Sequence, residues 1–194
     1  MYTSIHIPLS LFLLISSVGV ILAVPTWEGM NGRSSIGSLI PGVSHIQAMG
    51  PVATGGMMKH LALHRPGELG NITVAPLNRV APPLFYINQE QLWLLVNETA
   101  VYPVNVHNST SFHELPMQLV LGKKREGITN GIWRWKATML YYDLPGGKSN
   151  TGLFYQCMLE SGAYNVFMTP IASRPPSGCQ IMTLHSFVRN NLKN

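Results

Sequence analysis

The chain is poor in charged side chains and in catalytic motifs. Only 11% of its 194 residues are Asp, Glu, Lys or Arg, whereas roughly 25% is usual for soluble proteins. With so few acids, the paired carboxylates of a glycosidase have few candidates. There is no His-Glu-x-x-His, no Gly-x-Ser-x-Gly, no glycine-rich phosphate loop and no Cys-x-x-Cys. We therefore predict a protein without enzymatic activity and without a cofactor.

A concentrated basic patch is also missing, although the net charge is +5. A nucleic-acid-binding protein gathers such an excess on one element or face. The only basic run here is Lys123-Lys124-Arg125, which Glu126 follows directly. Three basic residues between two apolar segments are typical of a solvated hairpin loop. We expect no nucleic-acid partner.

The N-terminal segment has no Asp, Glu, Lys or Arg before Glu28. Its apolar core ends at the small residue Ala23, as in a secretory signal peptide, so we predict that residues 1–23 are a cleaved signal. The segment has no basic start and approaches the about 20 residues that span a bilayer, which leaves an uncleaved anchor as the alternative. After cleavage we expect no membrane association and a secreted protein, located extracellularly or in a cell wall.

The scarce cysteines and the sequons agree with secretion. Cys157 and Cys179 are the only two cysteines and lie 22 positions apart, which favours one disulfide over two free thiols in an oxidising compartment. Three Asn-x-Ser/Thr sequons begin at Asn71, Asn97 and Asn108. We predict N-glycosylation at these three asparagines.

Residues 24–83 are dense in glycine and proline and show no sustained periodicity. Breakers at this density predict a flexible leader, with at most a short helical turn near residues 57–64. The segment also contains a cluster of histidines and methionines: His45, Met49, Met57, Met58, His60 and His64. Imidazole and thioether groups suit copper, but a metal needs an organised site, and we expect no metal here.

After Pro83 the sequence changes to short aromatic and β-branched runs separated by turn residues. The predicted strands cover residues 84–87, 91–96, 100–106, 117–121, 132–137, 139–142, 152–157, 164–168 and 180–187. Strands of this length and spacing are typical of an all-β sandwich or barrel. We predict a compact all-β domain of about eight or nine strands over residues 84–194, with a β-trefoil-like barrel as the minority alternative.

Aromatic residues are the main candidates for a binding site. On a strand over residues 132–137, Trp133 and Trp135 project to the same face, and Tyr141 and Tyr142 follow on the next strand. If this face is exposed, the two indoles form a platform on which a sugar can stack. If it faces inward, the same residues belong to the core.

Several segments together resemble a family of small secreted proteins of filamentous and mushroom-forming fungi, which includes the cell-wall protein linked to phialide development. The resemblance covers about residues 84–187. It rests on Phe85-Tyr86-Ile87 with Leu92-Trp93-Leu94, on residues 133–142, on Leu153-Phe154-Tyr155-x-Cys157 and on the segment that begins at Cys179. It implies a secreted, wall-associated β-protein and brings no catalytic residues with it.

We therefore predict a non-enzymatic secreted glycoprotein of the cell wall or extracellular matrix, with polysaccharide as its candidate partner. The first alternative is a secreted interaction protein, either a protease inhibitor or an effector, that uses the loop over residues 122–131 and its Lys124 and Arg125 as bait. An enzyme is the third alternative and requires Asp143, Glu160 and a histidine in one pocket.

Overall fold

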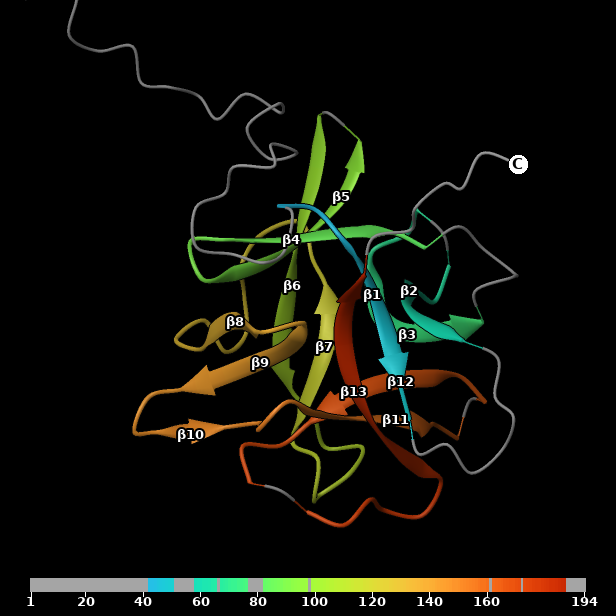
Figure 1. The fold of residues 1–194 in the computed structure, drawn as a ribbon. Coiled ribbons are helices and arrows are strands. Elements are labelled where there is room, and N and C mark those ends of the chain that lie inside the picture. The colour runs from blue at the N-terminus through green and yellow to red at the C-terminus, as the bar shows by residue number, and fades with distance from the viewer. Residues whose placement is uncertain are drawn as a thin grey trace, which may run out of the picture.

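The structure is a computed structural model and describes residues 42–50, 58–65, 67–76, 82–97, 99–160, 162–171 and 173–187. The predicted signal peptide and residues 24–41 lie outside these ranges. The described residues form an all-β protein of thirteen strands (Figure 1). In chain order the strands are β1 (His45–Met49), β2 (Lys59–Leu63), β3 (Gly70–Pro76), β4 (Leu84–Asn88), β5 (Gln91–Asn97), β6 (Ala100–Asn108), β7 (Met117–Leu121), β8 (Ile132–Lys136), β9 (Met139–Leu144), β10 (Lys148–Ser149), β11 (Leu153–Met158), β12 (Tyr164–Met168) and β13 (Cys179–Phe187). Nowhere in these ranges is there a helix long and apolar enough to span a membrane.

All nine strands predicted after Pro83 are present, as β4 to β9 and β11 to β13. They form because aromatic and β-branched residues pack well on a pleated surface and turn residues separate them. Gln89 and Glu90, with φ angles of 48° and 61°, make a two-residue turn between β4 and β5. The predicted all-β class and this hairpin are confirmed.

The prediction of a flexible leader is wrong for much of residues 42–76. This stretch contains β1, β2 and β3, and β2 occupies the place of the predicted helical turn. Ile46, Leu61 and Ile72 from these strands are completely buried. Pairing with neighbouring strands overrides the local preference of a Gly- and Pro-rich sequence, because each strand gains backbone hydrogen bonds and core contacts. The folded domain thus includes these strands as well as the described residues after Pro83.

The sheet bends back on itself. One continuous hydrogen-bonded path runs β10-β9-β13-β1-β2-β3-β7-β6-β5-β4. In addition, β11 pairs with β13 and with β12, and β12 pairs with β7. These pairings close a circuit through β1, β2, β3, β7, β12, β11 and β13, which is a barrel-like arrangement with few free edges. The long, curved strand β13 (Figure 1) pairs with β1 and with β11 in this circuit.

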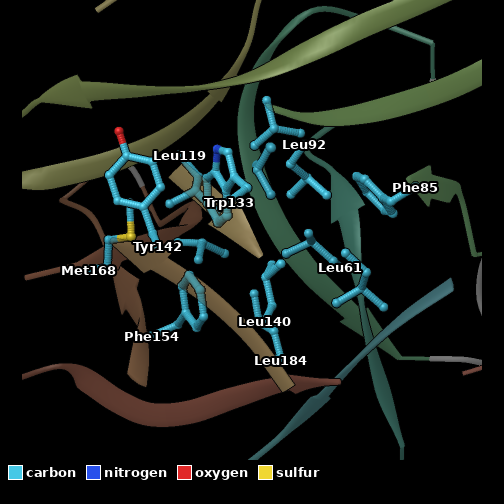
Figure 2. Close-up of a cluster of buried hydrophobic side chains, with 14 of the residues drawn as sticks. Leu61, Phe85, Leu92, Leu119, Trp133, Leu140, Tyr142, Phe154, Met168 and Leu184 are labelled. Carbon is cyan, nitrogen blue, oxygen red and sulfur yellow. The ribbon is translucent and has the colours of Figure 1, made fainter. Parts of the chain in front are cut away.

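One large apolar core fills the interior. Every strand except β10 contributes a buried residue to it. Figure 2 shows Trp133, Tyr142 and Phe154 gathered on one side of this core, with Leu61 and Phe85 on the other. A smaller cluster around Tyr155 and Phe167 lies on the opposite face of β11 and β12 and includes the cysteine pair.

Candidate functional site

The predicted sugar-stacking platform is contradicted by the position of Trp133. This indole is only 2% exposed, lies parallel to the Phe154 ring at a centroid distance of 6.5 Å and contacts Tyr142 at 4.7 Å (Figure 2). The hydroxyl of Tyr142 donates to the carbonyl of Ile128 at 2.9 Å, and burial raises the pKa of Tyr142 to about 12. Trp133 and Tyr142 therefore belong to the core.

The other two predicted platform residues do not share a face. Trp135 is partly buried and packs against the same core as Trp133. Tyr141 lies on the opposite face of the β8–β9 hairpin, where Arg134 and Lys136 stand over its ring at 4.8 and 5.9 Å. Alternation along the strand separates Tyr141 from the tryptophans, so the four residues form no common sugar-binding surface.

The cysteine prediction is confirmed, and the sequons are accessible. Cys157 and Cys179 form a disulfide and sit opposite each other on β11 and β13. Asn71, Asn97 and Asn108 are all exposed. Asn71 lies within β3, and Asn97 and Asn108 are the last residues of β5 and β6. Glycosylation of the three asparagines stays a prediction.

An open concavity among the described residues, which we call the groove, has a volume of about 640 Å³. Its walls come from the β2–β3 hairpin, from β5 and from the ends of β11, β12 and β13. The lining residues are Lys59, Ala62, Leu63, His64, Gly67, Thr73, Val74, Ala75, Pro76, Pro83, Leu94, Leu95, Val96, Gln156, Tyr164 and Gln180. The volume falls within the range of about 300 to 1,000 Å³ that is typical of small-molecule sites.

Most of the groove is apolar, and two of its polar residues, Gln156 and Gln180, lie near Lys59. The Lys59 ammonium donates to Oε1 of Gln156 at 3.4 Å, and Gln156 pairs across the sheet with Gln180. None of the described lining residues is a carboxylate. The ammonium and two carboxamides therefore offer hydrogen bonds and one positive charge beside an apolar wall.

The loop over residues 122–131 is exposed at its tip and fixed at its base. Lys123, Lys124 and Arg125 are exposed. The buried Asn105 donates to the carbonyl of Lys124 at 2.8 Å, and its Oδ1 accepts from the backbone N–H of Glu126 at 3.3 Å. One side chain thus holds the backbone on both sides of Arg125.

Two histidines of the predicted leader lie on neighbouring strands. His45 is on β1, where its Nδ1 lies 3.1 Å from the carbonyl of Pro83, and His60 on β2 is completely buried. In the described part of the chain no group of three His, Cys, Asp or Glu side chains is placed to hold a metal ion. Asp143 hydrogen-bonds to Arg134 and Ser149. Among the described residues it forms no hydrogen bond or ion pair with a histidine.

The sequence does not predict the groove, because the Gly- and Pro-rich composition of residues 24–83 indicates a flexible leader where β2 and β3 form one of its walls. The available signal was the pair of short apolar runs Leu61-Ala62-Leu63 and Ile72-Thr73-Val74 on either side of Gly67 and Gly70. Comparisons with protein families, with curated proteins and with solved structures found no match to this chain. The resemblance to small secreted fungal proteins therefore stays a prediction.

Proposed function

We propose that the protein is a non-enzymatic secreted glycoprotein that binds a small amphipathic ligand in the groove. The observation that carries this proposal is an apolar concavity of about 640 Å³ with a single lysine at its polar part and no carboxylate among its described lining residues. Ligand sites commonly combine an apolar wall with a few placed polar groups. The ligand class that fits is an apolar body with a carboxylate or a similar anionic end.

The chemistry of each part supports this class. Leu63, Pro76 and Val96 present apolar surface, and burying ligand surface against it contributes about 25 cal/mol per Å². Within the described part of the chain, the Lys59 ammonium has one long hydrogen bond, to Gln156, so an anionic group gains a charge-assisted bond there. The neighbouring carboxamides can orient that group.

The cellular location is part of the proposal. A disulfide and three exposed sequon asparagines support secretion. Association with a cell wall or extracellular matrix fits the resemblance to fungal wall proteins. Polysaccharide stacking on Trp133 and Trp135 is not part of the proposal, because Trp133 is buried.

Ligand titration tests the groove directly. We expect the purified secreted chain to bind a fluorescent long-chain fatty acid, and Lys59→Met to weaken that binding about tenfold while leaving binding of the matching uncharged alcohol unchanged. Ala75→Trp fills the groove and should abolish binding of both probes. Ala100→Trp, a partly exposed site on β6 outside the groove, is the matched control. Failure of the acid to bind, or unchanged binding by Ala75→Trp, contradicts the proposal.

A second candidate function is inhibition of a protease by the loop over residues 122–131. The observation that favours it is Asn105, which holds the backbone on both sides of the exposed Arg125. An exposed basic residue on a fixed loop can occupy the specificity pocket of a trypsin-like protease and resist cleavage, because a preorganised loop loses little entropy on binding.

Inhibition kinetics with trypsin test this second candidate. Double substitution Lys124→Ala with Arg125→Ala should abolish inhibition. Asn105→Ala should convert the loop from an inhibitor into a cleaved substrate. Lys148→Ala, at the exposed first residue of β10, is the control. If the wild-type chain does not inhibit trypsin, whether or not it is cleaved in this loop, this function is excluded.

A further inference from the structure

A second concavity, which we call the polar pocket, lies beside the β2–β3 turn on the outer face of the barrel. It has a volume of about 310 Å³ and differs from the groove in being lined mainly by polar and charged side chains. Its residues are His64, Arg65, Glu68, Leu69, Asn71, Leu159, Ala163 and Asn165. It is therefore suited to a small polar ligand.

Asn165 is the most unusual residue of the polar pocket. It lies on β12 opposite Cys157 and is completely buried. Neither its Nδ2 nor its Oδ1 has a hydrogen-bond partner among the described residues. Buried carboxamides are nearly always hydrogen-bonded, since leaving them unpaired is costly. The missing partner must both accept from Nδ2 and donate to Oδ1.

Asn71, the first residue of a sequon, also lines the polar pocket. It is exposed on β3, and its Oδ1 accepts from Nε2 of Gln118 on β7 at 2.9 Å. This bond fixes the plane of the carboxamide and directs Nδ2, the atom that receives an N-linked glycan, away from Gln118. Asn71 and Asn165 meet at this pocket because β3 and β12 both pair with β7.

We propose that the polar pocket is the docking site for the first N-acetylglucosamine of a glycan on Asn71. The inference rests on the secretory part of the proposed function. The sugar comes from a lipid-pyrophosphate-linked oligosaccharide: Asn71 Nδ2 forms a bond to the sugar C1, the lipid pyrophosphate leaves from C1, and Nδ2 loses one proton. The hydroxyl and acetamido groups of the sugar both donate and accept hydrogen bonds, as Asn165 requires.

The remaining lining residues suit a sugar as well. Arg65 and Glu68 face each other at 3.5 Å, with side chains 70% and 61% exposed, so both can also bond to hydroxyls at the rim. Leu159 and Ala163 supply an apolar surface for the C–H face of the sugar ring. A docked sugar ties the β2–β3 turn to the β11–β12 turn.

The experiment uses the full chain secreted from a eukaryotic host. Mass spectrometry should find a glycan on Asn71. Peptide-N-glycosidase should release it from the folded protein about tenfold more slowly than from Asn165→Ala, because the loss of docking hydrogen bonds exposes the linkage more often. Asn130→Ala, an exposed loop asparagine outside the pocket, is the matched control and should behave as wild type.

Thermal unfolding gives a second readout that does not depend on the glycosidase. Thr73→Val removes the sequon but keeps Asn71, and it should lower the Tm by a few degrees. In the Asn165→Ala background the same substitution should leave the Tm unchanged. An unmodified Asn71, equal release rates, or a Thr73→Val effect that is independent of Asn165 overturns the docking site. Retained fatty-acid binding in that case leaves the groove proposal intact.

Discussion

Replacing Trp133 with alanine tests whether this residue is part of the core or part of a binding surface. The indole is 2% exposed and is enclosed by Phe154 and Tyr142. Its backbone N–H also donates to the carbonyl of Glu90 at 2.8 Å, a bond that the substitution preserves. The variant therefore removes the side chain and leaves a cavity while the β8 backbone keeps its partners.

The expected loss follows from burial. Truncating a fully buried tryptophan removes its transfer free energy and adds the cost of the cavity, which together amount to about 3 to 5 kcal/mol. For a domain of this size each kcal/mol corresponds to about 2 to 4 °C in Tm, so we expect a decrease of about 6 to 20 °C. Trp93 is a matched control, since it is only partly buried in the small cluster beside the β4–β5 hairpin. Its replacement with alanine should cost about 1 to 2 kcal/mol.

Chemical unfolding monitored by circular dichroism measures both variants, with the free energy taken from the midpoint and slope of each curve. A loss below about 1 kcal/mol for Trp133→Ala, or a loss equal to that of Trp93→Ala, refutes the assignment of Trp133 to the core. Such a result would return the sugar platform as a hypothesis.

Two further predictions concern pH and the disulfide. Burial, aided by the charge of His45, lowers the pKa of His60, and burial lowers the pKa of His185. Since both folded-state pKa values lie below the unfolded value of 6.5, their stability contribution is present above pH 6.5 and is lost as the pH falls through the folded-state pKa values. Tm should therefore decrease below pH 6.5, and less steeply in His60→Leu; an identical pH profile for that variant contradicts the role of His60. The disulfide closes a loop of 22 positions, so Cys157→Ala with Cys179→Ala should lose about 3 kcal/mol. A reductant should destabilise the wild type but have no further effect on the double variant. If the fully reduced wild type is as stable as the oxidised protein, the disulfide does not make this contribution.

Much of the fold could be predicted because local signals and tertiary packing agree after Pro83. The run Leu92-Trp93-Leu94 is apolar, aromatic and bounded by turn residues, so it forms a strand in almost any β-rich context. The same consistency located the cysteine pair, since Cys157 ends one such run and Cys179 begins another. These strands can be predicted without knowing which strands they pair with.

The first three strands could not be predicted in this way. The sequence of β2, Lys-His-Leu-Ala-Leu, has no β-branched or aromatic residue to favour an extended backbone. It becomes a strand because β1 and β3 flank it and supply its hydrogen-bond partners. Since one wall of the groove consists of β2 and β3, the groove could not be predicted from the sequence either.

The sequence by itself determined the strand-forming segments after Pro83, the disulfide and the shared face of Trp133 and Trp135, because these depend on side-chain type and on the two-residue period of a strand. Only the tertiary structure decided that this face points inward, that β1 to β3 complete the barrel, and that Asn71 and Asn165 meet at one pocket. The physical reason is that burial and strand pairing join residues far apart in the chain. Such long-range contacts leave no trace in local periodicity.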